Sequence, residues 1–211
     1  MITEFPMDRE EKKAYTLQKI EEAVELKGGI IKTAEILDLG IDYRRIEQFV
    51  SEGSLRKVRN GVYTTVKIPY SEDKLIATMF GDGVLTMESA LYAYGYIDIK
   101  PMAYTIAISK NVSKSRFSLE YPMVIPYYTE PGVLELGVSE TDLDGNPMKI
   151  YTIDRLICDV LKYEDRLTKE TFRKAVMSYV NDSNKDIAKL MEYSAKRKVR
   201  QKVQSIIGMW L

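Results

Sequence analysis

The sequence predicts an α+β protein with two domains: a helical N-terminal domain that closes with a β-hairpin, and a C-terminal domain with a small sheet and terminal helices. The 211 residues, of which 45% are hydrophobic, are enough for one or two globular cores. Apolar residues at helical spacing, interrupted by glycines, cover residues 8–53, whereas β-rich runs separated by turn residues fill residues 104–151. We therefore expect domains at residues 1–70 and 71–211.

Three helices are expected in the N-terminal domain. Asp8 is suited to cap the first helix, because Glu11 follows three residues later, and a glycine pair ends that helix. Thr33 is expected to cap a short second helix that stops at Gly40, where glycine adopts a left-handed conformation at little cost. Asp42 should cap the third helix, residues 43–52. The apolar face of this third helix consists of Ile46, Phe49 and Val50.

A β-hairpin should follow the third helix. Leu55 and Val58 lead into Asn60-Gly61, the dipeptide best suited to a type I′ turn, and residues 62–64 return as the second strand. Two helices joined by a glycine-containing turn, the second one basic on its outer face, can place a recognition helix in the DNA major groove. The domain is therefore predicted to be a winged helix-turn-helix. The alternative is a small helical domain whose charged face is only solvated.

Candidate DNA contacts lie on the third helix and on the hairpin. Arg44 and Gln48 are i, i+4 neighbours, and their side chains are suited to guanine and adenine edges, so we expect them to contact bases. The remaining candidates would meet phosphates, because they are basic or hydrogen-bonding side chains at the start of the helix or near the hairpin tip. They are Tyr43, Arg56, Lys57 and Arg59.

The C-terminal domain is expected to contain a small sheet followed by helices. After a short helix at residues 75–80, the sequence becomes helical again from residue 153, with breaks near 165–167 and 181–184. A turn at residues 144–146 should precede the last strand. The expected strands are residues 104–109, 123–129, 133–138 and 148–151.

The composition excludes several classes of site. There is no histidine, which removes the commonest general base, the Ser-His-Asp arrangement and imidazole zinc sites. The single cysteine, Cys158, lies in an apolar stretch and is expected to be a buried structural thiol. We expect no cofactor and no metal site. Because the sequence has no signal peptide and no apolar run of membrane-spanning length, we also expect a cytoplasmic protein with no membrane partner.

Residues 29–41, 46–55 and 59–63 together resemble the N-terminal domain of the AbiEi family, and residues 86–96 and 153–163 are similar to segments of its C-terminal domain. The resemblance implies a non-enzymatic antitoxin of a type IV toxin–antitoxin, or abortive phage infection, system. Such antitoxins repress their own operon by binding inverted repeats in promoter DNA. They also neutralise a toxin of the nucleotidyltransferase fold, a task associated with the C-terminal domain.

Charge is distributed unevenly along a chain of zero net charge. Residues 28–67 carry seven basic and five acidic side chains, whereas residues 196–211 carry five basic side chains and no acidic one. We expect the last helix to present this charge to nucleic acid, to an acidic toxin surface or to a membrane interface, unless it is simply a solvated face. The basic residues are Lys196, Arg197, Lys198, Arg200 and Lys202, opposite an apolar face of Val199, Val203, Ile206, Ile207 and Trp210.

Two other functions compete with the antitoxin. A magnesium nuclease targeted by the winged helix would need clustered carboxylates and a lysine on adjoining strands, but Asp142 and Asp144 have the surroundings of turn residues. A ligand-sensing transcriptional regulator is the other alternative. Release of DNA by a small molecule would distinguish it.

Overall fold

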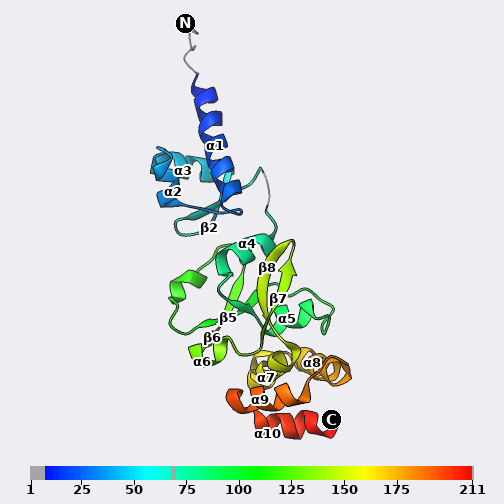
Figure 1. Ribbon diagram of the computed structural model, residues 1–211. Coiled ribbons are helices and arrows are strands. Elements are labelled where there is room, and N and C mark those ends of the chain that lie inside the picture. Colours follow the sequence, from blue (N-terminus) through cyan, green and yellow to red (C-terminus); the bar gives the residue numbers. More distant parts are fainter. Residues whose placement is uncertain (1–7, 68–69, 211) are drawn as a thin grey trace. The chain divides into compact units, whose positions relative to one another are not determined.

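The computed structural model describes residues 8–67 and 70–210. These residues form two compact units (Figure 1): the first runs up to Met79 and includes Ser118–Pro122, and the second comprises Phe80–Phe117 and the chain from Met123 onward. Helices and two sheets are both present, which confirms the predicted α+β class. The predicted functional boundary near residue 70 stays a prediction.

The first unit has helices arranged around a three-stranded antiparallel sheet of order β1-β3-β2. Helix α4 reaches the boundary between the two units, since its last residue, Phe80, belongs to the second. The elements are α1 (Arg9–Leu26), β1 (Ile31–Lys32), α2 (Thr33–Asp38), α3 (Tyr43–Ser51), β2 (Leu55–Arg59), β3 (Val62–Thr65) and α4 (Glu72–Phe80).

Two of the three predicted helix caps are confirmed. The Asp8 carboxylate accepts the Glu11 N–H and the Glu11 carboxylate accepts the Asp8 N–H, while the Asp42 carboxylate accepts the Arg45 N–H. The prediction for Thr33 is wrong, because Thr33 is the first helical residue of α2 and its N–H donates to the Gly61 carbonyl of the hairpin. The sequence also did not predict strand β1, just before Thr33, because two residues are too few to show the alternating pattern of a strand.

The hairpin forms where the sequence predicts it, but its turn differs. Gly61 has a φ of +73°, whereas Asn60 does not have the positive φ that a type I′ turn requires at both central positions. The pairing shifts by one residue between Lys57 and Arg59, which leaves Val58 as an extra residue in β2. Such a bulge bends the strand locally and increases its twist.

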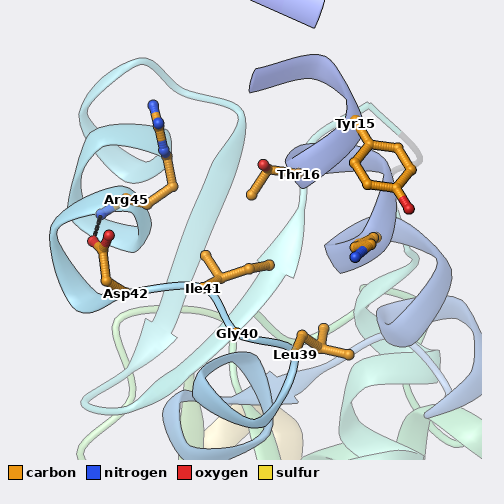
Figure 2. A pocket seen from close by; sticks show the side chains of 8 residues that line it. Tyr15, Thr16, Leu39, Gly40, Ile41, Asp42 and Arg45 are labelled. Carbon is orange, nitrogen blue, oxygen red and sulfur yellow. Dashed lines mark hydrogen bonds between the residues drawn. The ribbon is translucent and has the colours of Figure 1, made fainter. Parts of the chain in front are cut away.

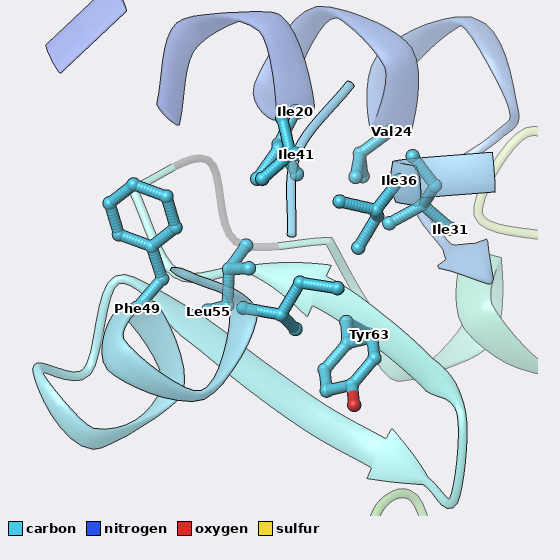
Figure 3. Close-up of a cluster of buried hydrophobic side chains, with 9 residues drawn as sticks. Ile20, Val24, Ile31, Ile36, Ile41, Phe49, Leu55 and Tyr63 are labelled. Atoms are coloured by element: carbon cyan, nitrogen blue, oxygen red, sulfur yellow. The ribbon is translucent and has the colours of Figure 1, made fainter. Parts of the chain in front are cut away.

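The core of the first unit lies between α1, α3 and the sheet (Figure 3). Ile46 and Phe49 of α3 are fully buried, as the predicted apolar face requires, while Val50 packs at the edge of the cluster. Burial of each such side chain stabilises the fold by about 1.5–3 kcal/mol. The buried cluster consists of Ile20, Val24, Ile31, Ile36, Ile41, Ile46, Phe49, Leu55 and Tyr63.

The second unit has a five-stranded mixed sheet of order β6-β5-β4-β8-β7, in which β6 runs parallel to β5 and β8 parallel to β4. The expected strand at residues 133–138 is wrong, because Pro131 begins a short helix there and the strand starts only at Val138. The elements up to the last strand are β4 (Val84–Leu85), α5 (Met87–Ala93), β5 (Tyr104–Ser109), a 3₁₀ turn (Lys114–Phe117), β6 (Val124–Thr129), α6 (Pro131–Leu134), β7 (Val138–Leu143) and β8 (Asn146–Tyr151).

The C-terminal helices of this unit lie together, segregated from the strands (Figure 1). The breaks expected near residues 165–167 and 181–184 are confirmed. The expected single last helix is wrong, since Lys198 has a φ of +60° and separates the basic residues 196–198 from the apolar residues that follow. The helices are α7 (Ile153–Lys162), a 3₁₀ turn (Glu164–Arg166), α8 (Lys169–Asn181), α9 (Ile187–Arg197) and α10 (Arg200–Lys202), followed by a π-helical turn (Val203–Ile207) and a 3₁₀ turn (Gly208–Trp210).

A buried ion cluster joins α7 to α9. Arg155, fully buried, pairs with Asp159 one turn later, and the Arg197 Nε donates to the same Asp159 carboxylate at 2.7 Å. The Arg155 guanidinium also lies 4.2 Å from the centre of the Tyr151 ring. A Cβ on Gly137 would come within 2.6 Å of the Arg155 Cβ. The position just before β7 therefore requires glycine.

Cys158 is buried next to this cluster, as predicted, and its burial raises the pKa of the thiol to about 12. It is therefore a protonated structural side chain at neutral pH. None of the helices in residues 8–67 and 70–210 has both the length and the apolar character needed to cross a membrane.

Replacing Asp159 with alanine should lower the free energy of unfolding by about 3–5 kcal/mol, because it leaves two buried guanidinium groups without a counter-charge. Glu192→Ala, which removes an exposed i, i+4 ion pair with Lys196, should cost only about 0.3–0.5 kcal/mol. Urea unfolding of the full chain measures both. Equal losses for the two variants would contradict the role of the buried cluster.

Candidate nucleic-acid interface

Helix α3 turns its polar face outward because Ile46 and Phe49 fix its opposite face in the core. The Asp42 cap fixes the start of the helix, and Tyr43 follows as its first residue with 51% of its surface exposed. Arg44 is also exposed. These two predicted contacts therefore lie on the accessible side of the helix, close to its N-terminus.

Gln48, the second predicted base contact, is held in a polar chain along α3. Its amide oxygen accepts from the Arg45 guanidinium at 2.8 Å, and its amide nitrogen donates to the Glu52 carboxylate at 2.8 Å. Glu52 also pairs with Lys13 of α1 at 3.0 Å. The amide hydrogen bond from Gln48 and then the one from Lys13 lower the pKa of Glu52. The chain orients Gln48 before any partner binds.

The basic residues of the hairpin have partners that the sequence analysis missed. The Lys57 ammonium lies 3.2 Å from the Glu120 carboxylate, and the Arg56 guanidinium lies 5.0 Å from the centre of the Tyr121 ring. Arg59 forms an antiparallel bridge with Leu119. All three partners belong to Ser118–Pro122, which is part of the first unit despite its distance along the chain. No local pattern connects two segments about sixty residues apart.

A hollow of about 280 Å³ separates α3 from the hairpin. Tyr43 and Lys57, predicted separately as phosphate contacts, both line it together with Glu47 and Tyr63. Interaction with Tyr63 and then with Glu47 raises the pKa of Tyr43, so its hydroxyl stays a hydrogen-bond donor at neutral pH. The fold thus brings a donor and a cation from two elements to one concave surface.

A second hollow of about 260 Å³ lies between α1 and the turn that precedes α3 (Figure 2). Tyr15 and Lys19 of α1 line one side, and Asp42 and Arg45 line the other. The Lys19 ammonium lies 4.7 Å from the centre of the Tyr15 ring. Since the turn between α2 and α3 forms one wall, this hollow lies directly beside the start of α3.

The basic residues near the C-terminus do not form one surface. Arg197 is a correction to the predicted set: only 3% of it is exposed, because its guanidinium is taken up by Asp159 in the buried ion cluster. Lys202 donates to the Leu161 carbonyl and pairs with Glu164 at 2.9 Å. Exposed basic side chains in this stretch are Lys196, which pairs with Glu192, and Lys198 and Arg200.

Across the part of the chain that the structure describes, no group of three or more His, Cys, Asp or Glu side chains is arranged to hold a metal ion. The geometry offers instead an exposed helix N-terminus, a basic hairpin and the hollow between them.

Comparison with known proteins gives two findings. Residues 18–66 match a family described as transcriptional regulator, AbiEi antitoxin, which confirms the resemblance drawn from residues 29–41, 46–55 and 59–63. The resemblance of residues 86–96 and 153–163 stays a prediction. The crystal structure of the RV2827C protein from Mycobacterium tuberculosis is similar in fold, with a TM-score of 0.68 at 13% identity, over 93% of this chain and 77% of that one. No curated protein sequence matches the chain.

Replacing Asp42 with alanine should destabilise the first unit by about 1 kcal/mol, because the Arg45 N–H at the start of α3 loses its acceptor. Asp38→Ala, which removes an exposed aspartate from the end of α2, serves as the control. Thermal unfolding followed by circular dichroism measures the difference. Equal melting temperatures for the two variants would show that the cap does not hold α3.

Proposed function

We propose that the protein is the antitoxin of a type IV toxin–antitoxin system, because residues 18–66 match the family of AbiEi antitoxin transcriptional regulators. It represses its own operon by binding inverted repeats in promoter DNA, and it neutralises a cognate toxin of the nucleotidyltransferase fold. The family match over the first unit is the observation that carries this proposal.

The first unit acts as a winged helix-turn-helix, with α3 as recognition helix and the β2–β3 hairpin as wing. The order of its elements supports this assignment, because α2 and α3 are joined by a short turn in which Gly40 has a φ of +78°. Recognition helices of this class contact base edges with residues near their N-terminus. Arg44 occupies that place, and its side chain is exposed.

The proposed contacts divide into base readers and phosphate contacts. Arg44 and Gln48 read bases, and the polar chain from Arg45 to Glu52 reduces the conformational freedom that Gln48 loses on binding. The exposed carboxylate of Glu47 repels phosphates, so α3 enters the groove by its N-terminal end rather than lying flat. Phosphates meet Tyr43, Arg56, Lys57 and Arg59.

The second unit carries out neutralisation of the toxin. Of the basic residues considered for this task, Lys196, Lys198 and Arg200 have exposed side chains, whereas Arg197 and Lys202 are engaged with groups of their own unit. A contact with an acidic surface of the toxin would therefore use the three exposed residues.

The double variant Arg44→Ala/Gln48→Ala should bind operator DNA at least about 30-fold more weakly, because each of the two lost base contacts removes about 1–3 kcal/mol of discrimination. Binding to a shuffled duplex of the same length should change little, since phosphate contacts remain. Fluorescence anisotropy with the region upstream of the protein's own gene measures both. Equal losses on the two duplexes would refute the assignment of α3 as base reader.

Co-expression with the nucleotidyltransferase-fold toxin encoded beside this gene should restore bacterial growth, because the antitoxin neutralises the toxin. Arg44→Ala/Gln48→Ala should restore growth equally well from a heterologous promoter, since both altered side chains belong to the first unit and neutralisation is assigned to the second. Lys198→Ala/Arg200→Ala should restore it less if the exposed basic residues contact the toxin. Persistent toxicity with abundant wild-type protein would refute the antitoxin function.

A further inference from the structure

We infer that Ser118–Pro122, which we call the strap, competes with DNA for the basic edge of the hairpin and so holds the affinity for DNA below its attainable value. The inference rests on the proposed DNA-binding function and adds an internal regulator to it. Three observations carry it: the backbone pairing of the strap, the partners of its side chains and the anchoring of its two ends.

The strap occupies the free edge of β2. In the first sheet, of order β1-β3-β2, the outer edge of β2 would otherwise expose unpaired backbone groups. The Val58 carbonyl accepts the N–H of Glu120 at 2.8 Å and that of Tyr121 at 3.4 Å, and Leu119 forms a bridge with Arg59. These contacts hold the strap in a fixed register along the strand that carries the basic residues.

In that register the strap places an acidic and an aromatic side chain on two cations of the wing. The Glu120 carboxylate lies 3.2 Å from the Lys57 ammonium, which is the kind of charge-assisted contact that a DNA phosphate oxygen would make. The Tyr121 ring lies against the Arg56 guanidinium, at 5.0 Å. A phosphate that approaches Lys57 must therefore displace Glu120.

Displacement is feasible because the contact is open to solvent. The side chains of Lys57 and Glu120 are 33% and 59% exposed, so water and ions screen their attraction. The strap thus lowers the affinity for DNA without blocking it.

Both ends of the strap are anchored in the second unit. Phe117, the residue before it, stacks on Phe80 with ring centres 5.2 Å apart and meets Tyr128 edge-on at 5.9 Å. On the other side, β6 begins at Val124 and pairs with β5. The strap therefore has little free chain on either side of Ser118–Pro122.

The test is the salt dependence of DNA binding by Glu120→Gln. In the wild-type protein the Glu120 carboxylate cancels the charge that Lys57 offers to a phosphate. The variant removes that carboxylate, so the slope of log K against log salt concentration should become steeper by about 0.9. At 0.1 M salt the affinity should rise about three- to tenfold for both the upstream duplex and a shuffled duplex, because phosphate contacts do not read sequence.

Glu130→Gln is the matched control, because it also removes one exposed carboxylate, here from an ion pair with Lys110 of the second unit. It should leave the slope unchanged. The double variant Glu120→Gln/Lys57→Gln should lose the gain in affinity, since the freed cation is gone.

The outcomes separate the inference from the proposed function. If wild-type protein binds DNA and Glu120→Gln has the slope and affinity of Glu130→Gln, the strap is only a structural cover of the hairpin and the inference is wrong. A lower melting temperature together with weaker binding by Glu120→Gln would overturn it as well. If wild type and all variants fail to bind either duplex, the DNA-binding function itself is refuted.

Discussion

The second unit depends on a buried electrostatic constraint: one carboxylate, Asp159, serves two buried arginines. Arg155 is on the same helix and Arg197 comes from α9, so the carboxylate fixes the position of one helix against the other. Buried charges are tolerated only when they are paired, which makes this arrangement demanding on its surroundings. The Tyr151 ring covers Arg155, and Gly137 leaves the space that Arg155 needs.

In the first unit, the proposed DNA contacts and the apolar core use opposite faces of the same helix. The apolar face of α3 fills the core, and the polar face carries a hydrogen-bonded chain from Arg45 through Gln48 and Glu52 to Lys13. These hydrogen bonds fix the orientation of the four side chains that they join. Arg44 lies outside the chain with its side chain exposed, as the proposed base contact requires.

The charge of the hairpin is set by a distant part of the sequence. A simple count of residues 28–67 gives an excess of basic over acidic side chains, but Glu120 of the strap offsets Lys57. The effective charge of a surface therefore depends on which acidic residues the fold brings to it, as well as on the local sequence.

The sequence by itself determined the features that depend on neighbours within about four residues. It located the Asp8 and Asp42 caps, the apolar face of α3 and the hairpin at Asn60-Gly61, because caps, helix periodicity and turns form through short-range contacts. The resemblance of residues 29–41, 46–55 and 59–63 to the AbiEi family is likewise visible in the sequence alone, and the match of residues 18–66 confirms it. These features orient α3 and the hairpin, but they do not include the partners of Gln48 or of the hairpin cations.

The tertiary structure decided what depends on residues far apart in the chain. The Thr33 N–H donates a hydrogen bond to the Gly61 carbonyl, and Thr33 does not cap the helix. Arg197 pairs with Asp159 in the interior instead of facing solvent. The strap on the hairpin likewise has no signal near residues 56–59. The physical reason is the same in each case. A hydrogen-bond acceptor or a counter-charge from another element decides whether a polar group is paired or free, and the residues next to that group in the sequence do not show which element will provide it.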